Sequence, residues 1–170
     1  ACPKRQGALA FENAGPVAAI TGEELQPGSH AFCVGPDPSR WTSGAPGFGR
    51  TVYRDVFEGV AIQFRAVGRG LEYDVILAPG ADLGQVVFRC EGVRGLAIDA
   101  TGSLVMDAGL GSLRQPPPHT WQDLPDGGRR EVKCAFRRLD GLRYGFSAPD
   151  YDPALPLTID PGIEWSTFLG

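Results

Sequence analysis

The sequence predicts an all-β domain, built as an antiparallel β-sandwich or a rolled, barrel-like sheet of about ten short strands with little or no helix. Apolar and polar residues alternate with a period of two in several segments, which is typical of strands with one buried face. The 24 glycines and 15 prolines fall between these segments, where they favour turns. No segment carries the apolar stripe of an amphipathic helix, so strands account for the whole predicted core.

The size and charge of the chain restrict its function classes. A folded domain of 170 residues buries roughly two-thirds of the surface that its unfolded chain exposes, which is enough for one ordinary core. The 16 basic and 20 acidic residues give a net charge of −4 without a basic cluster, so we expect no nucleic-acid partner. No apolar run approaches the ~20 residues that cross a bilayer, so we expect no membrane insertion.

The first part of the chain gives the weakest strand signals. We treat residues 1–28 as an N-terminal extension with uncertain strands and place the all-β domain at residues 29–162. A short apolar run is followed by Pro36 and Pro38, which disfavour a helix and indicate a turn. The glycine-rich stretch 44–49 is predicted to be a surface loop.

The clearest signal is a hairpin in the middle of the chain. Apolar and polar residues alternate over residues 60–65 and again over residues 71–77, with a glycine-containing turn at residues 68–70. The second strand turns Glu72 and Asp74 away from its apolar face. These segments therefore predict two paired antiparallel strands.

Further short strands follow in the second half of the chain. Residues 85–90, 95–99 and 103–107 are predicted to form a meander, and the prolines at 116–118 favour an extended edge crossing. The last predicted strands are residues 131–138, 142–146 and 155–160.

The end of the chain carries apolar residues without an obvious cover. Ile163, Trp165 and Phe168 begin a new apolar set after Pro161 and Gly162 have interrupted the pattern. Because an apolar patch without a partner is rare on a monomer, residues 163–170 are predicted to lead into a following repeat domain.

Four cysteines allow two interpretations. No zinc-binding spacing is present, so they are either free structural thiols or two disulfides formed in an oxidising compartment. For the second case, the favoured pairs are Cys90 with Cys134 and Cys2 with Cys33.

Four ordered motifs carry a resemblance to a known family. They are Val34-Gly-Pro-Asp-Pro-Ser-Arg-Trp41, Tyr53-Arg-Asp-Val-Phe-Glu-Gly-Val60, Leu71-Glu-Tyr-Asp-Val75 with Ala78-Pro-Gly-Ala-Asp82, and Pro156-Leu-Thr-Ile-Asp-Pro161. They resemble a bacterial domain of unknown function that stands ahead of the short β-propeller repeats called SBBP repeats, and the resemblance covers about residues 29–170.

The resemblance implies an exported, all-β module without enzymatic activity. The expected role is structural or adhesive, in a secreted or cell-surface bacterial protein, where the domain leads or caps a repeat region. The expected partner is the downstream repeat domain or a protein assembly. No catalytic residue is attached to the family, so none is expected here, and neither is a cofactor or a metal.

A carbohydrate-binding module is the alternative function. Exposed aromatic rings on a rigid sheet offer stacking surfaces for sugars at little entropic cost. Trp41 and Tyr151 lie in loops rich in proline and aspartate and are the candidates for such contacts with glycans.

A glycoside-active enzyme is the more distant alternative. Glu72 and Asp74 on one strand face stand roughly 7 Å apart, a separation compatible with two-carboxylate chemistry or a hard cation. Pairing with arginines across the sheet is the stronger interpretation, and Arg54, Arg65 and Arg143 are available for it. A serine nucleophile is not expected because the G-x-S-x-G elbow is missing.

Overall fold

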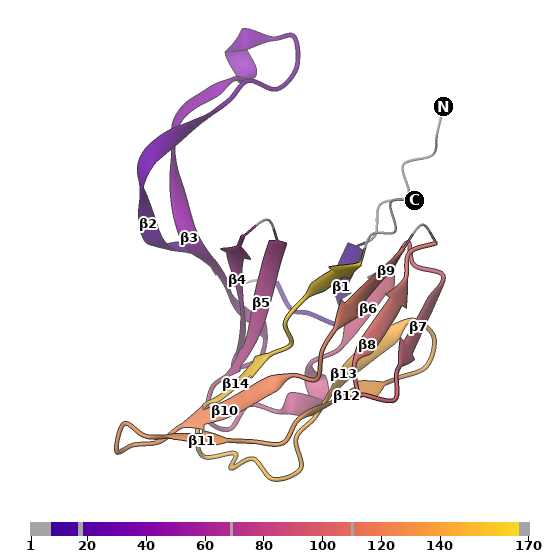
Figure 1. Cartoon of the computed structure of the whole chain (residues 1–170). Helices are drawn as coiled ribbons and strands as arrows, with labels where there is room; N and C mark the ends of the chain where they lie inside the picture. The colour runs from indigo at the N-terminus through magenta and orange to yellow at the C-terminus, as the bar shows by residue number, and fades with distance from the viewer. Residues whose placement is uncertain (1–7, 17–18, 69, 110, 167–170) are drawn as a thin grey trace.

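The computed structural model describes residues 8–16, 19–68, 70–109 and 111–166, and these residues form three antiparallel sheets (Figure 1). The first sheet has four strands, in the order β1 (Ala8–Phe11), β6 (Phe88–Glu91), β13 (Arg143–Ser147) and β12 (Ala135–Arg138). The third sheet also has four, in the order β15 (Glu164–Ser166), β9 (Ser112–Gln115), β8 (Leu104–Asp107) and β7 (Gly95–Ile98).

The second sheet has seven strands and is the largest. Its order is β11 (Arg129–Glu131), β10 (His119–Asp123), β14 (Leu157–Asp160), β5 (Gly70–Leu77), β4 (Val60–Val67), β3 (Thr42–Phe57) and β2 (Ala19–Phe32). Two short 3₁₀ helices, η1 (Pro38–Arg40) and η2 (Leu83–Gln85), complete the described elements. The all-β prediction is confirmed, and because no sheet closes on itself the arrangement is a sandwich rather than a barrel.

The predicted central hairpin is confirmed residue by residue. Strands β4 and β5 pair from Val60 with Leu77 to Val67 with Gly70, and Gly68 adopts a positive φ of 59° in the turn. Period-two alternation turns the apolar side chains of both strands toward the other two sheets. The buried residues of all three sheets form one hydrophobic cluster.

A buried hydrogen-bond network joins the three sheets. Tyr73 on β5 donates from its hydroxyl to Gln115 Oε1 on β9 over 3.1 Å, and its hydroxyl oxygen lies 3.0 Å from that of Tyr144 on β13. All three side chains are buried, and the Tyr144 ring stacks on Phe88 of β6. Each sheet therefore supplies one polar group that only the other sheets can satisfy.

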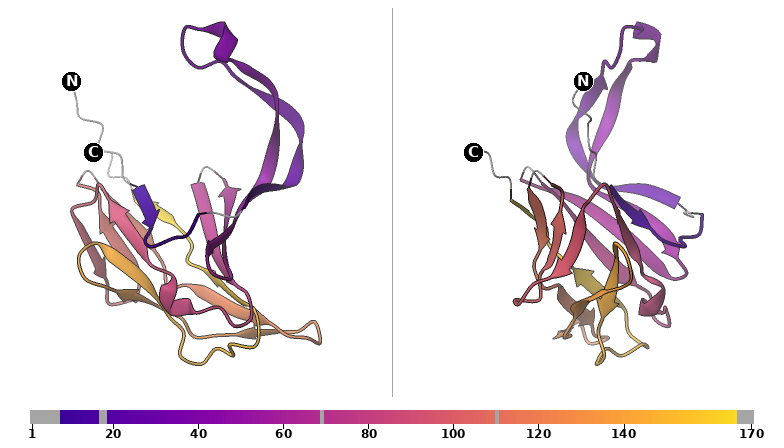
Figure 2. Two further views of the ribbon diagram at one scale, coloured as in Figure 1. Left: turned by 180° about the vertical axis from the view of Figure 1, so that it is seen from behind. Right: turned by 90° about the vertical axis from the view of Figure 1, so that its right-hand side faces the viewer.

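The greatest departure from the predictions is a long two-stranded ribbon made by β2 and β3, with η1 at its far end. Figures 1 and 2 show this ribbon extending beyond the ends of β4 and β5, away from the rest of the domain. Strand β2 has 14 residues and β3 has 16, and the register shifts between Gln26 and Ser29 and again between His30 and Phe32. The prediction of a surface loop at residues 44–49 is wrong, because these residues lie in β3.

The glycines of β3 explain why residues 44–49 resemble a loop in the sequence. A Cβ at Gly47 would lie 2.8 Å from His30 Nε2, and one at Gly49 would lie 2.7 Å from Glu24 Oε2. Side chains of β2 thus lie directly over the glycines of β3, which have no side chain to get in the way. These glycines of β3 therefore allow side chains of β2 to pack closely against the strand, and they do not mark a turn.

The predicted meander is correct only in its second half. Strands β7 and β8 pair around the turn at residues 99–103, whereas β6 belongs to the first sheet and pairs with β1 and β13. Part of the predicted N-terminal extension forms β1 and the first part of β2. Ile163 packs against the core and Glu164–Ser166 pairs with β9, while Phe168 and the Trp165 side chain lie outside the described part of the chain.

Replacing Tyr73 by phenylalanine tests the network that joins the sheets. The change leaves the buried Tyr144 hydroxyl and Gln115 Oε1 without their common partner, and we expect the free energy of unfolding to fall by at least about 2 kcal/mol. Tyr144→Phe removes only one contact and should cost less. Urea denaturation measures both.

Tyr53→Phe is the matched control for these variants. Tyr53 is half-buried, and its hydroxyl has no hydrogen-bond partner in the described part of the chain. The Tyr53→Phe substitution should therefore change the unfolding free energy by no more than about 0.5 kcal/mol. Equal effects of the Tyr73 and Tyr53 substitutions would show that the network does not stabilise the fold.

Candidate functional site

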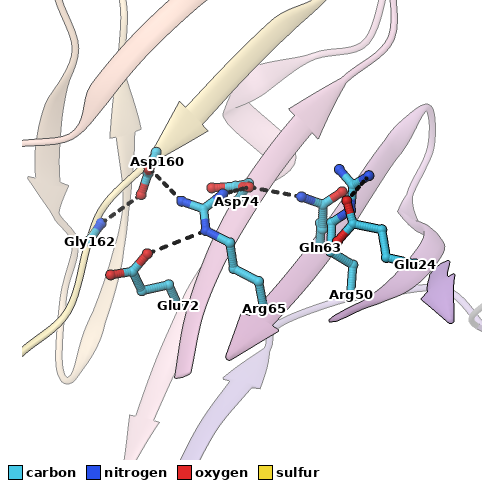
Figure 3. A network of polar contacts seen from close by, with 8 residues as sticks. All are labelled: Glu24, Arg50, Gln63, Arg65, Glu72, Asp74, Asp160 and Gly162. Carbon is cyan, nitrogen blue, oxygen red and sulfur yellow. Dashed lines mark hydrogen bonds and ion pairs between the residues drawn. The ribbon is translucent and has the colours of Figure 1, made fainter. Parts of the chain in front are cut away.

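A row of charged side chains crosses the outer face of the seven-stranded sheet (Figure 3). Its centre is Arg65 on β4, which uses all three guanidinium nitrogens. Nη1 lies 2.7 Å from Asp74, Nη2 lies 2.8 Å from Asp160, and Nε lies 3.3 Å from Glu72. The expected pairing of the strand carboxylates with an arginine across the sheet is confirmed for Arg65.

Strand register brings these four side chains together. Arg65 faces Glu72 directly in the β4–β5 ladder, and Asp74 is two residues further along the same face of β5. Strand β14 pairs with β5 so that Ile159 faces Val75, which places the next residue, Asp160, beside Asp74. The cluster therefore follows from the pairing of three strands.

Asp74 is the most deeply buried member of the row, with 3% of the residue exposed. Gln63 Nε2 donates to its Oδ2 over 3.0 Å, whereas Oδ1 has no hydrogen-bond partner in the described part of the chain. Burial raises the pKa of Asp74 to about 6. The attraction of Arg65 lowers the pKa and offsets only part of this effect, whereas the negative charge of Asp160 raises it further.

A polar hollow of about 510 Å³ continues this row toward the ribbon. It lies between β4 and the base of the ribbon, where Arg50 on β3 pairs with Glu24 on β2 over 2.8 Å. Its lining mixes charged, amide and aromatic side chains with one glycine: Glu24, Gln26, Phe48, Gly49, Arg50, Gln63, Arg65 and Ala66.

An exposed aromatic ring borders this hollow. A Cβ at Gly22 would lie 2.4 Å from Cγ and Cδ2 of Phe48 and 2.7 Å from Cδ1, so the ring covers the Gly22 backbone. Phe48 is nevertheless 44% exposed. The ring is thus supported from one side by the ribbon and open to solvent on another.

The two aromatic residues that the sequence singled out for sugar stacking lie apart. Trp41 follows η1 at the far end of the ribbon, is 45% exposed, and donates from its indole to the Gly35 carbonyl over 3.1 Å. Tyr151 is half-buried and packs against the hydrophobic core. The structure does not join them into one surface.

Asp99 has a structural role in the turn between β7 and β8. Asp99 accepts from the backbone amides of Thr101 and Ser103 and pairs with Arg114, as expected for a turn residue. Its hydrogen bond from the Thr101 hydroxyl is the main cause that lowers its pKa. In the described ranges, no group of three or more histidine, cysteine, aspartate or glutamate side chains could hold a metal ion.

The other two candidate arginines, Arg54 and Arg143, do not pair with Glu72 or Asp74 and instead contact other carboxylates. Arg54 lies 2.9 Å from Glu23 on the neighbouring strand. Arg143 lies 2.7 Å from Glu12 and also contacts Asp140. Arg54 is thus paired across two neighbouring strands, whereas the partners of Arg143 lie in the segments that flank strands of its sheet.

The predicted disulfide between Cys90 and Cys134 is wrong in this structure, where both are free thiols. Cys90 lies on β6 and Cys134 directly precedes β12, with β13 between these strands. A separation of two strand spacings, roughly 10 Å, is too long for a disulfide. Burial raises the pKa of the Cys90 thiol to about 11. Cys33 is exposed and free, and Cys2 lies outside the described residues.

Sequence reasoning found one half of this site and missed the other. Arg65, Glu72 and Asp74 lie in the clearly predicted hairpin, whereas Gln26 and Phe48 lie in segments interpreted as an extension and a loop. The two segments on either side of residues 33–41 pair along most of their length, and no local sequence pattern marks that pairing.

The fold and the site together define an all-β sandwich domain with an exposed ribbon and a polar hollow at its base. The chain belongs to the family described as a domain of unknown function (DUF7948), whose model matches residues 4–162. The match begins earlier than the expected resemblance and ends at the predicted boundary near residue 162.

Searches of curated proteins and of solved structures gave no match. In the described residues, no helix has the length and hydropathy required to span a membrane.

The raised pKa of Asp74 predicts a pH-dependent stability. The folded state holds the Asp74 proton more tightly than an ordinary aspartate with a pKa of 3.8 does. The stabilisation from this proton is therefore complete below about pH 4 and is lost as the pH rises through about 6. At 1.36 kcal/mol per pH unit, and with the unfolded carboxyl already partly ionised at pH 4, the unfolding free energy of the wild type should fall by about 2 kcal/mol relative to Asp74→Asn between pH 4 and pH 7.

Urea denaturation at several pH values measures this difference. Asp150→Asn, at an exposed carboxylate that makes no side-chain hydrogen bond in the described structure, is the control and should follow the wild type at every pH. A constant difference between wild type and Asp74→Asn would contradict the assignment to this carboxyl group.

Proposed function

We propose that this domain is a non-enzymatic structural or adhesive module of a secreted or cell-surface bacterial protein, and that the β2–β3 ribbon holds its partner. The partner is the downstream repeat domain or an assembly of such proteins. The single observation that carries the proposal is the exposure of apolar side chains along the ribbon.

The ribbon contains most of the exposed apolar side chains. Six of the ten large hydrophobic residues that are exposed in the described part of the chain lie within residues 19–57, and they are Ile20, Leu25, Phe32, Val34, Trp41 and Phe48. Exposed apolar patches of this kind mark interaction surfaces on soluble proteins.

The architecture of the ribbon points in the same direction. A two-stranded ribbon in water is marginally stable on its own, and a long edge strand offers unpaired backbone groups to another chain. Both properties suit an element that is completed by a partner. The location and the neighbouring repeat region follow from the resemblance to the domain that precedes SBBP repeats.

The C-terminal end of the domain is compatible with a following repeat. Strand β15 is the edge strand of the third sheet, so its other edge is open to further strand pairing.

Trimming the ribbon tests whether it serves binding or folding. Gln26 and Gly47 face each other across the ribbon, so residues 27–46 can be replaced by a two-residue Asn-Gly turn that joins them. We expect the trimmed domain to fold with an unfolding free energy within about 1 kcal/mol of the wild type, because the ribbon beyond this pair contributes nothing to the core cluster.

Amide hydrogen exchange tests whether a downstream partner covers the ribbon. Amides of residues 27–46 should exchange rapidly in the isolated 170-residue chain and become protected when the chain is extended by its natural downstream sequence. Strong protection in the isolated chain, or a trimmed domain that fails to fold, would assign the ribbon to the fold itself and overturn the proposal.

A further inference from the structure

We propose that the polar hollow at the base of the ribbon binds a neutral sugar ring, which stacks on Phe48 and is held by hydrogen bonds from the side chains around it. The site lies at the base of the ribbon and is distinct from residues 27–46, the far part of the ribbon that the trimming experiment removes. It also differs from the pair Trp41 and Tyr151 that the sequence suggested.

The hollow has the size of a small-molecule site. Its volume of about 510 Å³ lies within the range of pockets that hold small ligands, roughly 300 to 1,000 Å³. Three strands contribute its walls, two of them at the base of the ribbon: Gln63 and Arg65 come from β4, Phe48 and Arg50 from β3, and Glu24 from β2. Strand pairing therefore holds these side chains in fixed relative positions.

Phe48 provides the stacking surface. Its ring covers the Gly22 backbone, which supports it where any other residue would push it away. An aromatic ring that is already immobilised loses little entropy when a ligand packs on its open side. The ring is exposed despite this support, because no side chain of the described chain fills the hollow in front of it.

The polar groups of the hollow are oriented and only partly used. Gln63 donates to Asp74, which leaves its carbonyl oxygen as an acceptor without a partner in the described chain. Gln26 donates to the Glu24 backbone carbonyl and likewise retains a free carbonyl oxygen. Arg50 uses Nη2 for Glu24 Oε1, so Nη1 and Glu24 Oε2 remain as a further donor and acceptor.

The charge balance of the hollow favours a neutral ligand. Arg50 is paired with Glu24, and every guanidinium nitrogen of Arg65 is taken by a carboxylate. A phosphate or a nucleic-acid strand requires uncompensated positive charge, which this surface does not supply. A ring with several hydroxyl groups, each both donor and acceptor, matches the mixture of free donors and acceptors around the aromatic ring.

Titration with sugars tests this site directly on the 170-residue chain. The probes are glucose, galactose, mannose, N-acetylglucosamine and their common disaccharides. Isothermal titration calorimetry and saturation-transfer NMR measure their binding. We expect at least one probe to bind with a dissociation constant below 10 mM, on the order expected for a single stacked ring with a few hydrogen bonds. No binding by any probe would overturn the proposal.

Two variants locate the bound sugar. Phe48→Leu keeps apolar bulk but removes the ring, and Gly22→Ala keeps the ring but displaces it, so each should weaken binding at least tenfold. Phe32→Ala removes another exposed aromatic ring of the same ribbon that does not line the hollow, and it should bind as the wild type does. Wild-type affinity in both Phe48→Leu and Gly22→Ala would refute the site.

The trimmed domain separates this inference from the proposed function. It keeps Gln26, Phe48 and the rest of the hollow lining, so it should bind sugar with the affinity of the full chain. A trimmed domain that binds sugar but loses partner contact supports both proposals. Loss of sugar binding on trimming would place the ligand on the far part of the ribbon and contradict the hollow as its site.

Discussion

The hydrogen bonds among Tyr73, Tyr144 and Gln115 fix the positions of the three sheets relative to one another. Hydrophobic packing alone tolerates small sliding of one sheet over another, but a buried hydroxyl that loses its partner costs about 1–3 kcal/mol, so the network selects one arrangement. The Tyr144 ring, stacked on Phe88 with an interplanar angle of 11°, prevents the hydroxyl from turning elsewhere. The network thereby also fixes the position of the seven-stranded sheet, whose outer face carries the charged row and the hollow.

The hollow arises where the sheet changes from many strands to two. Strand β3 pairs with β4 only from Arg50 to Phe57, whereas it pairs with β2 over most of its length. Beyond Arg50 the ribbon has no third strand to restrain it, and two-stranded ribbons twist more strongly than wide sheets. The ribbon therefore diverges from the end of β4 and leaves space between them, which polar side chains line because water reaches it.

Local pattern and register account for what could be predicted from the sequence. The β4–β5 hairpin has regular alternation and a glycine turn, so its faces, its turn and the pairing of Glu72 and Asp74 with an arginine across the sheet could be predicted, although three arginines were candidates for that partner. The ribbon could not be found in this way, because the glycines at positions 47 and 49 resemble a loop until the side chains that cover them are known. The disulfide prediction failed for a related reason, since the order of β6, β13 and β12 is set by long-range pairing that no local pattern encodes.

The two register shifts in β2 protect the long exposed ribbon from aggregation with other copies of the chain. A continuous open edge is a template on which identical chains can stack into aggregates. The shift at residues 26–29, next to Pro27, and the second at residues 30–32 divide this edge into short stretches that differ in spacing. A second chain that pairs along one stretch falls out of step at the next. The ribbon can thus remain open to a shaped partner while it resists the indiscriminate strand stacking that leads to fibrils.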